Sequence, residues 1–288
     1  MSRSSIGKAL VTKYYNMLTG IAIKDFINTK TNRFVIRVAS IIDRRIKFKT
    51  PEFNKLYKDI VSSTIYISKD DDKSSWGFTL LYNGTKYIVA KGGLHSKDDP
   101  RVFEVLTKPN MLMRDADVTS FYPKNILNLR ISPKHLIAKA FLTIVDYVMT
   151  ARVKAKHEFT AIAKSNPKMS AMLKKKAEIY KIAINRMYGA FKDAFDYLYD
   201  PECTYKTTIN GQLYLLMLVE ELEINGIHVI SANTDGIVAL FDKSLESEYK
   251  RICSEWEKSL DFELEYTDYE KYIRFNVNNY IAIKKGFY

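Results

Sequence analysis

The chain is poor in cysteine and has no long apolar run. Its 288 residues include two cysteines, Cys203 and Cys253, which lie 50 positions apart and form no C-x-x-C pair. This usage excludes a disulfide framework and a cysteine-based zinc site, and it favours a reducing compartment. No segment approaches the roughly 18 consecutive apolar residues of a membrane span, and the N-terminal residues hold no signal-peptide core. We therefore expect a cytoplasmic protein with no membrane partner.

The sequence also lacks internal repeats and low-complexity stretches. Hydrophobic residues make up 47% of the chain and charged residues 27%, which excludes an intrinsically disordered protein. At about 150 residues per domain, the length allows one large domain or two modest ones.

Positive charge is in excess, and aromatic side chains accompany it. Lys and Arg number 45 against 33 Asp and Glu, a net charge of +12, alongside 20 Tyr and 15 Phe. A basic, aromatic surface suits a polyanion whose bases can stack. A genome that favours Lys and Tyr codons explains the same composition equally well, so composition alone leaves both interpretations open.

Local patterns predict a mixture of helices and strands. An Asn-Gly pair at 83–84, between the β-prone residues 76–81 and 86–90, predicts a β-hairpin. Helical periodicity from 138 to about 164 and from 169 to about 188 predicts a helical hairpin with lysines on both arms. The other expected helices are 7–18, 51–60, one from 121 through 129, 208–225 and 246–260, and the other expected strands are 111–118, 227–232, 237–241 and parts of 262–283.

Two aspartates stand where a predicted strand meets a turn. Asp117 ends the strand 111–118, and Asp235 lies at the tip between strands 227–232 and 237–241. If these strands are neighbours in one sheet, the carboxylates can meet and bind hard divalent cations through oxygen. Either aspartate by itself is more often structural, because Asp is common at turns, where its side chain hydrogen-bonds the backbone.

Three segments in order resemble the signatures of family B DNA polymerases. Residues 117–123 (DVTSFYP) resemble motif A, DxxSLYP; residues 181–189 (KIAINRMYG) resemble motif B, KxxxNSxYG; and residues 233–236 (NTDG) resemble motif C, DTDS. Each lies in the predicted setting that the family uses. The segments 10–15 (LVTKYY) and 92–96 (GGLHS) also look like the bacteriophage branch, so the resemblance covers nearly the whole chain.

The resemblance implies an α+β fold with an antiparallel palm sheet, flanking helices and a helical-hairpin fingers subdomain. The domains expected from it are a basic α+β lead-in over 1–110, a palm segment with motif A over 111–137, the fingers over 138–188, and palm over 189–288 with the start of a connection to a thumb.

The resemblance also implies the chemistry. Asp117 and Asp235 would be the catalytic, metal-binding carboxylates, and the carbonyl of Val118 would complete the nucleotide-bound metal site. The cofactors would be two Mg²⁺ ions, with Mn²⁺ as a substitute, and the partners would be primer-template DNA and a dNTP. The reaction would be attack of a primer 3′-hydroxyl on the dNTP with release of pyrophosphate.

The same resemblance assigns the nucleotide-binding residues. The backbone amides of Ser120, Phe121 and Tyr122 would meet the triphosphate at a helix start, where unpaired N–H groups favour anions. The Tyr122 ring would lie under the sugar and exclude a 2′-hydroxyl, although the residue type alone suits a core aromatic.

Two pairs of residues, each with i,i+4 spacing, complete that set. Lys181 and Asn185, one helical turn apart, would contact the triphosphate, and Arg152 and Lys156, with the same spacing, its terminal phosphates. A solvated face is the alternative for any such run of cations.

Template and primer would contact a further set of residues. It comprises Tyr188, Gly189, Thr234, Lys284 and Lys285. Glycine at 189 would let a base pair approach the backbone.

The chain departs from the family pattern at three motif positions. Asn233 replaces the first Asp of motif C, which we expect to alter metal affinity without abolishing the chemistry. Gly236 replaces a Ser, and Arg186 replaces the Ser of motif B and would add a cation near the template. The 64-residue spacing from Asp117 to Lys181 leaves no room for the insertion of protein-primed members.

Two segments typical of the family are missing from the sequence. Residues 1–110 hold no DxE-type exonuclease set, and no thumb follows Lys284 and Lys285. We therefore expect a split or truncated polymerase, with a second polypeptide supplying a thumb or exonuclease. The alternatives are a non-catalytic nucleic-acid-binding remnant and a reverse transcriptase, which motif B disfavours.

Overall fold

The structure is a computed structural model that describes residues 3–67, 76–97, 100–106, 108, 110–276 and 278–286. The chain divides into two compact units, and each is described by itself. The helical unit comprises Met1–Phe34 and Tyr122–Thr207, and the sheet unit comprises Val35–Phe121 and Thr208–Tyr288.

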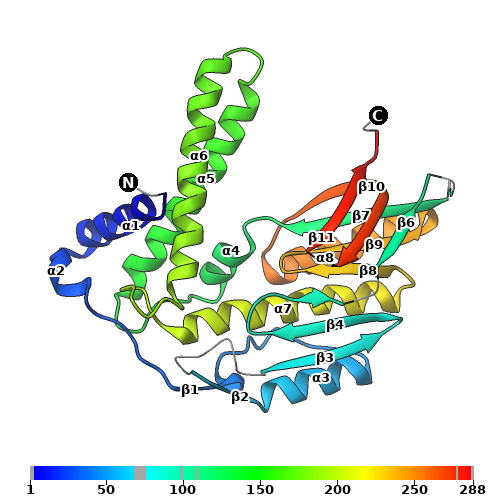
Figure 1. The fold of residues 1–288 in the computed structure, drawn as a ribbon, viewed down its shortest axis with the longest axis horizontal. Coiled ribbons are helices and arrows are strands. Elements are labelled where there is room, and N and C mark those ends of the chain that lie inside the picture. Colours follow the sequence, from blue (N-terminus) through cyan, green and yellow to red (C-terminus); the bar gives the residue numbers. More distant parts are fainter. Residues whose placement is uncertain are drawn as a thin grey trace. The chain divides into compact units, whose positions relative to one another are not determined.

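A large antiparallel sheet dominates the sheet unit (Figure 1). Among the described residues it has nine strands in the order β11-β10-β7-β9-β8-β5-β4-β3, with β6 also paired to β10. Its strands are β3 (Gly77–Tyr82), β4 (Thr85–Ala90), β5 (His95–Ser96), β6 (Arg101–Glu104), β7 (Met111–Val118), β8 (His228–Asn233), β9 (Gly236–Asp242), β10 (Leu264–Asn276) and β11 (Asn279–Lys284). A separate two-stranded sheet pairs β1 (Val35–Arg37) with β2 (Thr64–Tyr66).

The turns of the sheet follow from local sequence. Asn83 and Gly84 both have positive φ, 47° and 82°, as a two-residue hairpin turn of the primed type requires. The Asn-Gly signal therefore predicted the β3–β4 hairpin correctly. Along β7, Ala116 and Val118 are buried while Asp117 is exposed, so the period of two directs this aspartate away from the core.

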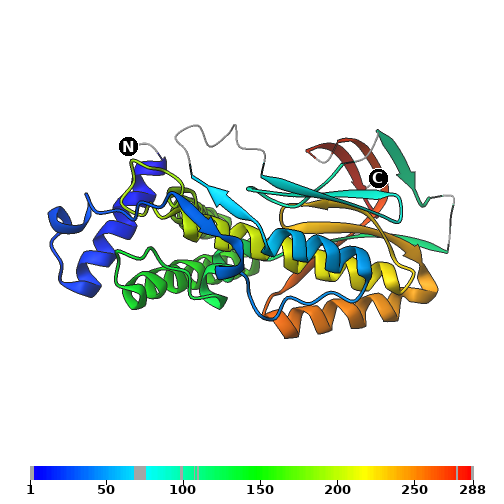
Figure 2. The same ribbon diagram turned by 90° about the horizontal axis from the view of Figure 1, so that it is seen from below.

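Helices α3 (Pro51–Val61), α7 (Pro201–Ile224) and α8 (Glu246–Leu260) lie along the sheet (Figure 2). Residues 208–224 of α7 belong to the sheet unit, and buried polar side chains tie them to it. The Gln212 amide donates to the Ala90 carbonyl at 2.8 Å and accepts from its N–H at 3.0 Å. The Glu220 carboxylate accepts from the N–H of Thr50, the residue that caps α3, at 2.8 Å.

The helical unit is built around two long antiparallel helices. Asn166 caps the second of them, accepting from the Met169 N–H at 3.1 Å, and Ser170 donates to the Phe159 carbonyl of the first at 2.8 Å. Its helices are α1 (Arg3–Thr19), α2 (Ile23–Phe26), α4 (Phe121–Asn128, from its second residue), α5 (Ala138–Ala161), α6 (Pro167–Ala190) and residues 201–207 of α7. Short 3₁₀ turns, Val38–Ser40 and Lys243–Leu245, occur in the sheet unit.

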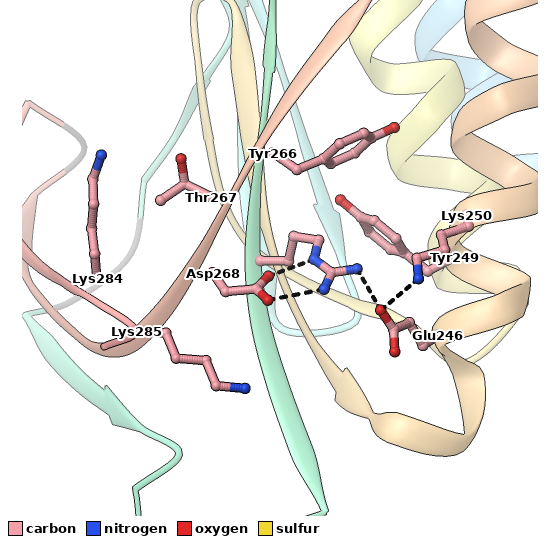
Figure 3. A pocket seen from close by; sticks show the side chains of 9 residues that line it. Glu246, Tyr249, Lys250, Tyr266, Thr267, Asp268, Lys284 and Lys285 are labelled. Atoms are coloured by element: carbon pink, nitrogen blue, oxygen red, sulfur yellow. Dashed lines mark hydrogen bonds and ion pairs between the residues drawn. The ribbon is translucent and has the colours of Figure 1, made fainter. Parts of the chain in front are cut away.

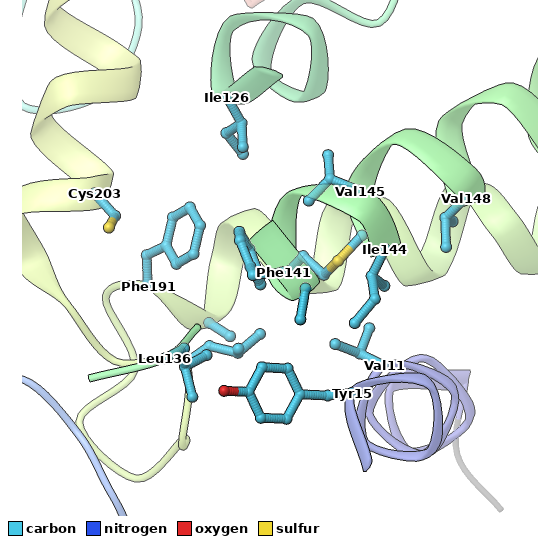
Figure 4. Close-up of a cluster of buried hydrophobic side chains, with 14 of the residues drawn as sticks. Val11, Tyr15, Ile126, Leu136, Phe141, Ile144, Val145, Val148, Phe191 and Cys203 are labelled. Atoms are coloured by element: carbon cyan, nitrogen blue, oxygen red, sulfur yellow. The ribbon is translucent and has the colours of Figure 1, made fainter. Parts of the chain in front are cut away.

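The core of the helical unit lies where α1, α4, α5 and α6 meet (Figure 4). Tyr15, Phe141 and Phe191 are fully buried in it. Gly7 allows α1 to approach α6 closely, because a Cβ there would lie 3.2 Å from the Cα of Ala183.

The elements differ from the sequence expectations in a few places. Helix α7 begins at Pro201 rather than 208, since Pro at the first turn of a helix is favourable. Helix α6 continues through Gly189 to Ala190. Residues 1–34 belong to the helical unit. The boundaries of the two compact units therefore differ from those of the four segments predicted from the sequence, and these segments stay a prediction.

Candidate functional site

Asp117 and Asp235 lie at the same end of two neighbouring strands of the sheet unit. Strands β7 and β9 are paired so that Asp117 faces Gly236, and the N–H of Val118 donates to the carbonyl of Asp235 at 2.7 Å. Both aspartates are exposed. The condition that the sequence left open, adjacent strands in one sheet, is therefore met.

The turn that carries Asp235 is tight and strained. Asn233 pairs with Gly236, so Thr234 and Asp235 form a two-residue turn. Thr234 has a φ of 47°, which is an outlier for a β-branched side chain. Such strain persists where surrounding contacts fix the backbone, and it clusters at functional sites.

Gly236 permits the close approach of the two strand ends. A Cβ at this position would lie 3.0 Å from the carbonyl oxygen of Ala116 and 3.1 Å from the Oδ1 of Asp117. The Ser of the family pattern would therefore press on Asp117 in this backbone, and glycine leaves that carboxylate room.

The site is electrostatically negative. Partial desolvation raises the pKa of Asp235. Burial raises the pKa of Asp115, and the neighbouring charge of Asp235 raises it further. The pKa of Tyr280 rises because of burial and then because of Asp115, Asp117 and Asp235. A bound cation would offset the negative charge that raises the pKa of Asp115.

Asp115 is the acidic residue of this face that sequence reasoning missed. The Tyr269 hydroxyl donates to its Oδ2 at 2.9 Å. The signal was available, since residues two apart on a strand lie on one face, and Asp115 precedes Asp117 by two.

The donor set suits a hard divalent cation. Carboxylate oxygens are the ligands of Mg²⁺, which takes one or two of them together with substrate phosphates. Among the described residues, no three His, Cys, Asp or Glu side chains are placed to hold a metal by themselves. Val118 is buried beside the pair.

The motif A segment turns into α4 directly after β7. Ser120 has a φ of 52°, and Phe121 begins the helix with its ring buried edge-on against Phe262, 5.2 Å between centroids. Ser120 and Phe121 thus stand at a helix N-terminus, as predicted; their contact with a triphosphate stays a prediction.

In the helical unit, the predicted sugar-contacting and template-contacting tyrosines meet. The rings of Tyr122 and Tyr188 stack with centroids 4.6 Å apart and an interplanar angle of 29°. Burial, and then Tyr122, raise the pKa of Tyr188. Gly189 follows within α6, and a Cβ there would meet nothing within 4 Å, so packing does not demand glycine at this position.

The predicted phosphate-binding residues lie on the two arms of the α5–α6 hairpin. Lys181 and Asn185 are exposed on α6, and on α5 Lys156 is exposed while Arg152 is half-buried. Their contact with phosphate stays a prediction.

Arg186, which replaces the Ser of motif B, takes part in an internal ion pair. Its guanidinium pairs with Asp196, a carboxylate whose side chain is 1% exposed and which also lies 3.3 Å from Lys8. A buried carboxylate needs such partners. The expectation that Arg186 adds a cation near the template stays a prediction.

Lys284 and Lys285 are exposed at the end of β11 and line a pocket of about 570 Å³ (Figure 3). The positive charge of Lys284 lowers the pKa of Asp115, which places this lysine near the acidic face. In the pocket, Arg114 is held by Asp268, at 3.0 Å from Nη2 to Oδ2, and by Glu246 at 3.1 Å. This network neutralises the guanidinium internally.

Comparison with known proteins shows a similarity of fold. No protein-family model and no curated protein sequence matches the chain. Among solved structures, the family B DNA polymerase from the hyperthermophilic archaeon Pyrobaculum calidifontis is similar, with a TM-score of 0.50, 16% identity and 66% of this chain covered. The match covers 27% of that polymerase. The chain thus has a polymerase-like α+β fold, and in the described part no helix is long and apolar enough to cross a membrane.

Proposed function

We propose that this protein is a template-directed DNA polymerase, in which a primer 3′-hydroxyl attacks a dNTP and pyrophosphate leaves. The observation that carries the proposal is the pairing of Asp117 with Gly236, which puts Asp117 and Asp235 side by side at one end of the sheet. Residues 117–123, 181–189 and 233–236 supply the signature motifs, and the similar fold of a family B DNA polymerase supports it.

In this proposal the sheet unit supplies the catalytic carboxylates. Asp117, Asp235 and the carbonyl of Val118 would hold two Mg²⁺ ions, or Mn²⁺. When bound, such ions activate the 3′-hydroxyl and neutralise the departing pyrophosphate. The residues of the chain contribute position and charge, and no covalent intermediate is required.

The remaining residues would bind nucleotide and DNA. Arg152, Lys156, Lys181 and Asn185 would contact the triphosphate, with Tyr122 under the sugar as the group that rejects ribonucleotides. The backbone N–H groups at the start of α4 would donate to phosphate oxygens. Template and primer would contact the predicted set of Tyr188, Gly189, Thr234, Lys284 and Lys285.

The proposed enzyme is of bacteriophage type and acts in the cytoplasm of the host cell. Its segments would correspond to palm and fingers. Since the matched region is 27% of the archaeal polymerase, the activities of its other parts are not carried over to this chain.

The test is primer extension with Mg²⁺ or Mn²⁺. We expect Asp235→Asn to reduce extension by at least about 100-fold, the scale of removing a group that stabilises transition-state charge. Asp146→Asn is the matched control, because Asp146 is exposed on α5, outside the proposed machinery. Equal extension by wild type and Asp235→Asn would show the assignment to be wrong.

A second candidate is a non-catalytic nucleic-acid-binding protein, and Asn233 favours it because motif C then lacks one carboxylate. It predicts salt-sensitive DNA binding without metal-dependent dNTP binding. Titrating a dNTP in the presence and absence of Mg²⁺ separates the two. Extension on an RNA template would instead indicate a reverse transcriptase.

A further inference from the structure

The loop 92–96 lies directly against the turn that carries Asp235. The carbonyl of Leu94 accepts from the N–H of Thr234 at 2.7 Å. His95 pairs with Asn233 across β5 and β8. The hydroxyl of Ser96, which is 2% exposed, accepts from the N–H of Ala232 at 3.1 Å. Three successive residues before Asp235 are therefore held by this loop.

Gly93 makes the closest contact. A Cβ at this position would lie 2.6 Å from the Oγ1 of Thr234 and 2.9 Å from both its Cα and its Cβ. Separations under 3.0 Å require the neighbour to shift, and part of this neighbour is backbone. The adjacent Gly92 differs completely, because a Cβ there would meet nothing within 4 Å.

The turn needs such support. Thr234 holds a φ of 47°, a strained conformation for a β-branched residue that persists only where surrounding contacts fix it. One support comes from β7, through the bond from the Val118 N–H to the Asp235 carbonyl. The loop supplies the other support on Thr234.

We infer that the loop 92–96, and Gly93 above all, is a positioning element that holds the Thr234–Asp235 turn so that the Asp235 carboxylate meets a metal ion beside Asp117. The inference rests on the proposed function, since it concerns the metal-binding carboxylates. Gly93 touches Thr234 rather than substrate, so it acts through the turn. Gly93 lies outside motifs A, B and C, and the resemblance assigns no role to residues 92–96.

The contact is local to the turn. Strand β5 has two residues and a single bridge to β8, whereas β8 and β9 are held to each other over five pairs. Displacing Thr234 would therefore change the direction of Asp235 while the sheet keeps its register.

The experiment compares Gly93→Ala with Gly92→Ala in the full chain. Mn²⁺ affinity is measured from the electron paramagnetic resonance of the free ion, well below the thermal midpoint of each variant. We expect Gly93→Ala to bind Mn²⁺ at least 10-fold more weakly, and Gly92→Ala to stay within 2-fold of wild type. We also expect high Mn²⁺ to restore primer extension by Gly93→Ala but not by Asp235→Asn, because the first retains its carboxylate.

The second part of the experiment removes the side chain that the new methyl group at position 93 would meet. In Gly93→Ala with Thr234→Gly, the side chain that the new methyl group meets is gone and positive φ is unstrained, so we expect Mn²⁺ affinity to recover at least 3-fold. If Gly93→Ala does not fold, Ser96→Ala decides, since it removes a loop-to-β8 bond without adding bulk. Weakening of 3-fold or more supports the inference, and unchanged binding overturns it.

The outcomes separate this inference from the function. A wild-type chain that binds no Mn²⁺ would overturn both. A wild type that binds Mn²⁺ and loses it on Asp235→Asn, with Gly93→Ala unchanged, would overturn the positioning role alone and leave the proposed polymerase site intact.

Discussion

At the scale of single residues, three glycines differ in whether the packing of the chain requires them. Gly93 and Gly236 stand where a Cβ would collide with the turn or with Asp117. Gly189 has open space around it and a helical conformation in α6. The first two are explained by packing within the chain, and the third is not.

Gly189 yields a prediction in which stability and activity move in opposite directions. Gly189→Ala improves helix propensity, so we expect the free energy of unfolding to rise by up to about 1 kcal/mol. If a template base pair approaches this backbone, the added methyl group should lower primer extension by 10-fold or more. Denaturant unfolding and primer extension on one preparation check both. Unchanged extension with raised stability would remove Gly189 from the proposed DNA contacts.

At the scale of elements, α5 distributes its cations by helical period. Arg152 and Lys156 are one turn apart and share a face, whereas Lys154 lies on another side. Lys154 is 75% exposed in its side chain and lies 4.0 Å from Glu158. The helix therefore contains its own control for the proposed phosphate contacts.

We expect Arg152→Gln and Lys156→Gln each to raise the KM for dNTP about 10-fold, the size of one charge-assisted hydrogen bond to phosphate. Lys154→Gln should change the KM less than 2-fold. Steady-state extension at varied dNTP concentration provides the measurement. Equal effects of all three substitutions would indicate a general charge effect rather than a specific face.

Some of the helices and strands could be predicted from the sequence, and other features could not. Strands β3, β4, β7, β8 and β9 and helices α5, α6 and α8 were predictable, because periodicity, an Asn-Gly turn and Pro punctuation are local signals. The additional residues 201–207 at the start of α7 were not predictable, since they follow a segment without periodicity. The partner of Arg186 was not either, because Asp196 lies ten residues on and only packing selects it.

At the scale of the whole molecule, charge is unevenly distributed along the chain. Residues 138–190 hold 11 of the 45 basic residues and 3 of the 33 acidic ones, so this segment carries +8 of the net +12. An excess confined to one helical hairpin suits a phosphate backbone better than a uniform codon bias does.

This distribution predicts steeply salt-dependent DNA binding. The logarithm of the binding constant should fall with the logarithm of salt concentration, and Lys174→Gln with Lys175→Gln should flatten the slope by up to about 1.8. Lys55→Gln with Lys58→Gln is the control pair on α3, where Lys55 already pairs with Asp59 at 2.7 Å. Fluorescence anisotropy of labelled duplex DNA between about 50 and 200 mM salt measures both. A slope that responds equally to both pairs would contradict a localised DNA contact.

The sequence by itself determined which segments form helices and strands, and it singled out Asp117 and Asp235 as candidate site residues. Strand period, turn chemistry and motif spacing are properties of neighbouring residues, so the sequence carries them directly. Only the tertiary structure decided that β7 and β9 are adjacent and that the loop 92–96 lies on the turn of Asp235. These pairings join residues more than a hundred positions apart. Their register is set by which faces bury apolar side chains against the helices, and one residue's own neighbours do not encode it.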